Sequence, residues 1–137
     1  MSQLKRNIST LIRPILKNGV SCVGVINKNG RLDEMVCKDD LPLSKDQKEI
    51  FFMYIKLRSS MQMDFDVELQ PVYYNITERG DVKIVTIPIG DKVVFSLMDK
   101  TENHIQVVEN LCSVFNNLEM FSHSLNMPVD VKSTEYQ

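Results

Sequence analysis

The sequence has no tryptophan, two histidines, three cysteines and five glycines, and each scarcity excludes a class of protein. His104 and His123 are too far apart to be the clustered ligands of a zinc site. The glycines form no GxGxxG motif. Gly19 and Gly24 have the separation of a phosphate loop, but two apolar residues follow them where Lys-Ser/Thr is needed. We therefore expect no metal, no cofactor and no nucleotide hydrolysis by this chain.

Basic residues are not in excess, since 16 Lys and Arg stand against 18 Asp and Glu. This balance argues against a nucleic-acid partner, because binding to phosphates requires a basic surface. No apolar run reaches the roughly 20 residues of a membrane helix. Residues 1–6 are too polar for a secretory signal, and three cysteines without a CxxC pair suit a reducing compartment. We expect a cytoplasmic protein that does not insert into membranes.

The 137 residues suffice for one domain with its own core. We place this domain at residues 1–121, because residues 122–137 become polar and lose periodicity, as a poorly ordered tail does. A helical stripe of apolar residues runs from Leu4 to Leu16, with Pro14 either kinking the helix or delaying its start.

Two strand patterns, residues 20–28 and 31–38, flank Asn29-Gly30, which is a strong hairpin signal. With these two residues as the loop, Val23 pairs with Val36 and Cys22 lies opposite Cys37, whereas a bulge at Gly30 would shift the register by one residue. The two cysteines are interpreted as packed thiols. A Cys22–Cys37 disulfide acting as a redox pair is the alternative, with the Cα atoms about 5.5 Å apart if the pair is hydrogen-bonded.

A second helix begins at Ser44, which with Gln47 forms a capping box, and runs to about Met61. It carries two apolar stripes, although one is enough to cover a sheet. The first is Ile50, Met53, Tyr54, Leu57 and Met61, and the second begins with Phe51 and Ile55. The extra stripe predicts a second burial partner for this helix.

Three further strands are predicted at residues 72–78, 82–89 and 92–98, and a last helix runs to about residue 119. Pro71 favours an edge position for the first of these strands, and the other two are apolar on both faces. The chain is therefore predicted to be an α+β protein of element order αββαβββα. A five-stranded antiparallel sheet lies between helices in a three-layer α/β/α sandwich.

The sequence offers no catalytic constellation of nucleophile, base and orienting group, so we expect no enzyme activity. Asp64, Asp66 and Glu68 alternate with apolar residues and would line one face of an extended segment. Without the glycine turn of a calcium loop, a solvated face is the favoured interpretation of these acids.

The layout resembles the roadblock (dynein-light-chain-like) domain family, which is related to profilin-like and longin-like folds. Three features carry the resemblance over residues 3–119. They are the segment Gly19-Val-Ser-Cys-Val-Gly-Val-Ile-Asn-Lys-Asn-Gly30, the meander from Val72 to Asp99 with turns at Gly80 and Gly90-Asp91, and the final helix. The central helix holds more aromatic residues and methionines than is typical of the family, and the tail has no counterpart in it.

The resemblance implies a non-catalytic dimeric scaffold that regulates a small Ras-like GTPase. Family dimers form through the second helix and the third strand. On this sequence, the implied homodimer interface is Phe51, Phe52, Met53, Tyr54, Ile55, Val72, Tyr73, Tyr74 and Ile76. The alternative is a profilin-like domain that senses a small molecule, with a pocket lined by Met35, Phe95 and Met98.

Overall fold

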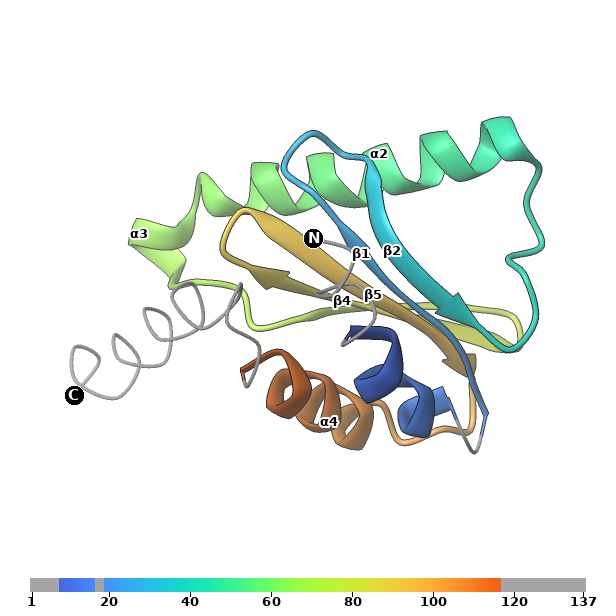
Figure 1. Cartoon of the computed structure of the whole chain (residues 1–137). Helices are drawn as coiled ribbons and strands as arrows, with labels where there is room; N and C mark the ends of the chain where they lie inside the picture. Colours follow the sequence, from blue (N-terminus) through green and yellow to red (C-terminus); the bar gives the residue numbers. More distant parts are fainter. Residues whose placement is uncertain (1–7, 17–18, 117–137) are drawn as a thin grey trace.

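The computed structural model describes residues 8–16 and 19–116 (Figure 1). Residues 8–12 are helical and continue as a 3-10 helix. The elements that follow are η1 (Arg13–Leu16), β1 (Val20–Ile26), β2 (Leu32–Cys37), α2 (Lys45–Met63), α3 (Asp66–Leu69), β3 (Asn75–Arg79), β4 (Val82–Ile89), β5 (Lys92–Asp99) and α4 (His104–Asn116). The predicted α+β order is confirmed, with the short α3 added. The predicted tail, residues 122–137, lies outside the described residues.

The strands form one antiparallel sheet in the order β2-β1-β5-β4-β3. The central strands β1, β4 and β5 are buried along most of their length, as their two-faced apolar sequences predict. Strand β3 is at one edge, which confirms the position that Pro71 favoured, and β2 is at the other. An edge strand leaves one row of backbone groups unpaired within the sheet.

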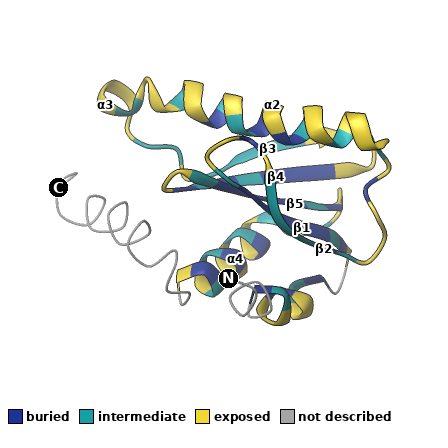
Figure 2. Cartoon of the chain, turned by 45° about the horizontal axis from the view of Figure 1, so that its top comes forward, coloured by how far each residue is buried: buried dark blue, intermediate teal, exposed yellow. Residues whose placement is uncertain are grey.

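Helices cover both faces of the sheet (Figure 2). On one face, the first helical segment and α4 pack on a core that includes Ile12, Val94 and Phe115. On the other, α2 packs on a smaller core that includes Phe52 and Phe95. This arrangement confirms the predicted three layers.

The β1–β2 hairpin has the predicted register over most of its length, since Cys22 pairs with Cys37 and Val23 with Val36. The register shifts beyond Val25, and the turn closes with a hydrogen bond from the Asn27 N–H to the Arg31 carbonyl. The loop is therefore longer than the two residues that Asn29-Gly30 indicated, and a bulge in the hairpin accommodates the difference.

The start of β3 differs from the sequence prediction, and the start of the last helix is set by a side-chain cap. Strand β3 begins at Asn75 rather than at residue 72, after Gln70 with its positive φ of 76°. The last helix begins at His104, because the Asn103 side chain accepts the hydrogen bond of the Gln106 N–H and caps the helix. The helix buries Val107, Leu111 and Phe115 and leaves Ile105 exposed.

Candidate functional site

The surface of α2 that points away from the sheet is apolar. Five large side chains on it are 41–69% exposed, namely Ile50, Met53, Tyr54, Leu57 and Met61. At about 100° per residue these positions fall on the side opposite the buried Phe52, Ile55 and Ser59. We call these five residues the outward face of α2. They are the first of the two apolar stripes in the sequence, and Figure 2 shows the outer surface of the helix as largely exposed.

Exposed apolar residues continue beyond the end of the helix. Phe65, Val67 and Leu69 in and next to α3 are 59%, 89% and 73% exposed. Contiguous exposed apolar surface of this extent is uncommon on a monomeric soluble protein and marks an interaction site. The outward face of α2 is therefore the candidate functional site.

Aromatic packing fixes the orientation of α2 on the sheet. The Phe95 ring, which is fully buried, lies with its centroid 5.9 Å from that of Phe51 and 5.7 Å from that of Phe52. Gly24 makes room for this ring, because a Cβ atom at Gly24 would lie 2.4 Å from a Phe95 ring carbon. The contact sets which side of α2 faces the sheet, and hence which side faces outward.

The residues of the implied dimer interface do not lie on one surface. Phe52 and Ile55 are buried beneath α2, and Phe51 packs against the same core. Tyr74 and Ile76 pack on the core at the opposite face of the sheet. Val72 is half-buried, whereas Met53, Tyr54 and Tyr73 are exposed.

The outward face also includes Ile50, Leu57 and Met61, which the implied interface omitted. Their signal was present in the sequence as the first helical stripe. The contiguous stretch from Phe51 to Ile55 winds around the helix, so only part of it can point outward.

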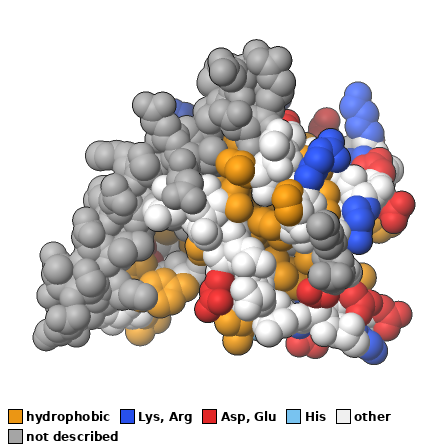
Figure 3. Space-filling model, turned by 60° about the horizontal axis from the view of Figure 1, so that its bottom comes forward, with side chains coloured by type: hydrophobic (Ala, Val, Ile, Leu, Met, Phe, Trp, Pro, Cys, Tyr) orange, Lys and Arg blue, Asp and Glu red, His pale blue; other side chains and the backbone are white. Residues whose placement is uncertain are grey.

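Other exposed apolar residues are more scattered. Figure 3 shows the side of the molecule that carries η1 and α4, where hydrophobic side chains also reach the surface. Leu11 is 41% exposed and Ile105 53%. Single exposed apolar residues are ordinary on protein surfaces, so these two do not mark a second site.

The proposed ligand pocket of the sensing alternative is wrong. Met35 and Phe95 pack on the α2 side of the sheet, while Met98 packs on the α4 side. The sheet therefore separates the three residues, and they cannot line a common pocket.

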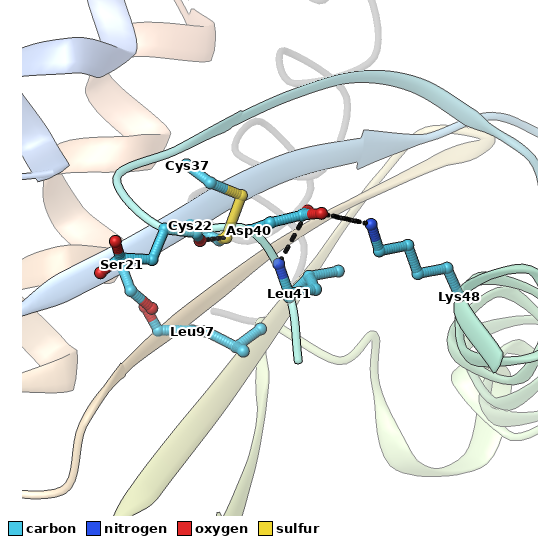
Figure 4. Close-up of a disulfide and its surroundings, with 8 residues drawn as sticks. Ser21, Cys22, Cys37, Asp40, Leu41, Lys48 and Leu97 are labelled. Carbon is cyan, nitrogen blue, oxygen red and sulfur yellow. Dashed lines mark hydrogen bonds and ion pairs between the residues drawn. A yellow bond between two sulfur atoms is a disulfide. The ribbon is translucent and has the colours of Figure 1, made fainter. Parts of the chain in front are cut away.

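Cys22 and Cys37 form a disulfide (Figure 4). The interpretation of this pair as two packed thiols is therefore wrong. The disulfide of the alternative is present, and its action as a redox pair stays a prediction. Their Cα atoms are 4.1 Å apart, closer than the value expected for a hydrogen-bonded pair. The Lys38 N–H donates to the Ser21 carbonyl, so the neighbouring cysteines occupy a non-hydrogen-bonded position, where opposed strands approach more closely.

Reduction of this disulfide is expected to lower the free energy of unfolding by about 3 kcal/mol. A link between residues 15 apart restricts the unfolded chain by roughly that amount. Urea denaturation with and without a thiol reductant measures the change. The Cys22→Ser/Cys37→Ser variant should match the reduced protein and show no response to reductant. A wild-type protein with the same midpoint under both conditions would contradict the expectation.

Cys112 is the free cysteine. Burial and the nearby Glu109 carboxylate raise the pKa of the Cys112 thiol, which keeps it in its unreactive form. Asp64, Asp66 and Glu68 lie around the end of α2 and in α3, not in an extended segment as predicted. Residues 8–16 and 19–116 contain no group of three potential metal ligands. None of the helices in these ranges has the length and apolar character needed to cross a membrane.

No protein-family model matches the chain, and neither does any curated protein sequence. Solved structures do match. The Roadblock/LC7 domain from Streptomyces avermitilis has a TM-score of 0.63 at 7% identity, covering 94% of this chain and 98% of that one. MglB from Myxococcus xanthus matches with a TM-score of 0.65 at 11% sequence identity, and the match covers 90% of each chain. A structure described as MglB with tetrameric arrangement matches with a TM-score of 0.66 at 8% sequence identity, and the match covers 93% of each chain. The chain has the Roadblock/LC7 fold, as the resemblance implied.

Proposed function

We propose that this chain is a non-catalytic scaffold domain that forms a homodimer through the outward face of α2. The apolar character of that face is the observation that carries the proposal. Five large apolar side chains remain in contact with water after the chain has folded. Covering them with a second protein surface removes this area from water, which is the main driving force of association.

The spacing of the outward face fits a second copy of the same helix. Counted from Ile50, its members lie at positions i, i+3, i+4, i+7 and i+11. This is the pattern of a helix that packs lengthwise against another helix. Because a two-fold dimer brings the same patch of both copies together, one such stripe supplies both halves of the contact.

Acidic residues border one end of the outward face. Asp46 and Glu49 line an open groove there with Ile50 and Met53. Lys56, further along the helix, instead donates from its ammonium to the Asp91 carbonyl in the β4–β5 turn. The apolar stripe rather than charge pairing therefore supports the proposed self-contact.

The edge strand β3 supplies a second element of the contact. It pairs with β4 on one side only, so its other backbone row is available to a further strand. The resemblance implies that two such strands meet in family dimers. An oligomer also agrees with the tetrameric arrangement named for the MglB structure.

Sedimentation equilibrium of the full chain at micromolar concentration tests this proposal. We expect a species of twice the 15.8 kDa of one chain, dissociating on dilution. A mass of 15.8 kDa throughout the micromolar range would exclude the dimer.

The partner that we propose for the scaffold is a small Ras-like GTPase in the cytoplasm, as the resemblance implies. The disulfide would meet reducing conditions there, so the reduced chain must keep its fold for this part of the proposal to hold. GTPases from the same organism should change their rate of nucleotide exchange or hydrolysis when the dimer is added. Unchanged rates for all of them would remove the GTPase from the proposal without affecting the dimer.

A further inference from the structure

The contact between α2 and the edge strand β3 is polar, whereas Phe52 and Ile55 of the same helix pack on an apolar core. Strand β3 lies beneath α2 (Figure 2), and Asn75 and Thr77 on this strand make hydrogen bonds to α2 side chains. The Asn75 and Gln62 amides donate to each other, at 2.8 and 2.7 Å. One turn away, an Arg58 N–H donates to the Thr77 hydroxyl at 3.3 Å. A cavity of about 60 Å³ lies along this contact.

The charged residues that line this cavity are both basic. Its lining includes two arginines, Arg58 and Arg79, and no acidic residue. The other members are Phe51, Tyr54, Ile55, Ser59, Asn75, Thr77, Ile84 and Thr86. In the described part of the chain, neither arginine takes part in an ion pair. Two positive charges near one cavity favour an anion between them over a further cation.

The cavity also has more donors than acceptors. Arg58 uses one of its five N–H groups on Thr77, and Arg79 has no hydrogen-bond acceptor among the described residues. The Thr77 hydroxyl accepts from Arg58, and the Thr86 hydroxyl accepts from Asn75 at 3.4 Å. Each of these hydroxyls therefore keeps its own proton available for donation.

We propose that this cavity binds a phosphate-type oxyanion, either free or as part of a phosphomonoester. Guanidinium groups bind phosphate oxygens through paired, charge-assisted hydrogen bonds. The cavity volume is about 60 Å³, and one water needs roughly 10–15 Å³ of it. The cavity therefore has room for about four to six waters, which is enough for a small oxyanion. The donors come from α2, β3 and β4, and this spread suits a tetrahedral acceptor better than a planar carboxylate.

Calorimetric titration of the full chain with inorganic phosphate, at constant ionic strength set with chloride, tests the proposal. Arg79→Gln removes an exposed side chain on the edge strand, and Arg58→Gln removes the guanidinium from α2. Each is expected to weaken phosphate binding at least about tenfold, the effect of losing a charge-assisted hydrogen bond. Arg31→Gln is the matched control, because Arg31 is an exposed arginine in the β1–β2 turn and does not line the cavity.

Three results would overturn the proposal. They are no phosphate binding by the wild-type chain, equal affinity in the cavity variants and the wild type, and an equal loss in Arg31→Gln. Circular dichroism of each variant confirms that it is folded. A parallel titration with phosphoserine distinguishes the two sources of the anion. If phosphoserine binds the wild-type chain and this binding is lost in Arg79→Gln, the site is assigned to a phosphomonoester. If inorganic phosphate binds and phosphoserine does not, the site is assigned to the free ion.

Discussion

Replacing Leu57 by lysine is expected to convert the proposed dimer into a monomer, with self-association weakened at least about 100-fold. Leu57 lies on the outward face of α2 and is 53% exposed in the single chain, so lysine can be accommodated without disturbing the core. In the dimer, the ammonium group of the new lysine would be buried among apolar side chains, and each of the two copies would contribute one such buried charge. Interface anchors of this kind contribute about 2–4 kcal/mol, and each 1.4 kcal/mol changes the dissociation constant tenfold.

The control for this experiment is Ser113→Lys, which introduces the same charge at an exposed position of α4. It should leave the dissociation constant unchanged, because α4 covers the opposite face of the sheet. Sedimentation equilibrium over a range of concentrations measures both variants. A Leu57→Lys protein that associates as strongly as Ser113→Lys would show that the outward face is not the contact.

The largest effect on stability is expected for Phe95→Ala, with a loss of about 3–5 kcal/mol in the free energy of unfolding. Phe95 is fully buried and packs between Gly24 on β1 and the two phenylalanines of α2. Its removal leaves a cavity where the helix meets the sheet. Urea denaturation followed by circular dichroism measures the change.

Gly24→Ala probes the same contact from the other side. The added methyl would lie 2.4 Å from the Phe95 ring, so we expect a loss of about 1–3 kcal/mol from overpacking. In the Phe95→Ala background this clash is absent, and the second substitution should cost much less. The double variant is thus expected to be more stable than the sum of the two losses predicts. Additive losses would mean that the cost of Gly24→Ala does not come from contact with the Phe95 ring.

Local sequence signals were sufficient to predict most of the fold. Ser44 and Gln47 form the predicted capping box at the start of α2. The 82–89 strand has the predicted bounds, because apolar residues continue on both faces between two glycine turns. Pro14 coincides with the change from the helical segment 8–12 to the 3-10 helix, where a regular helix would require an N–H that proline lacks.

What the sequence could not predict depends on contacts between distant residues. Two apolar stripes on α2 were visible, but only the packing of Phe95 decides which of them faces the sheet. Lys83 is an example of a different kind. It is 7% exposed, and its ammonium donates to the Glu102 carbonyl and lies 3.0 Å from His104 Nδ1. A lysine in a strand is ordinarily expected to be solvent-exposed. The burial of Lys83 could not be predicted, because its partners lie in a loop and a helix that come later in the sequence.

The candidate anion site shows the same limit. Arg58 and Arg79 are 21 positions apart in the sequence and have no common motif. They line one cavity because β3 takes the edge position next to β4, where α2 passes over it. No spacing rule connects the two residues before the strand order is known.

Methionine oxidation offers the most direct test of the claim that a second copy covers the outward face of α2. Met53 and Met61 belong to that face, while Met63, 50% exposed, points away from it. Oxidation by peroxide follows exposure, and mass spectrometry quantifies it at each residue. We predict that Met53 and Met61 are oxidised several-fold more slowly in concentrated than in dilute protein, with Met63 unchanged. If the oxidation rates of Met53 and Met61 do not change with protein concentration, the account is contradicted.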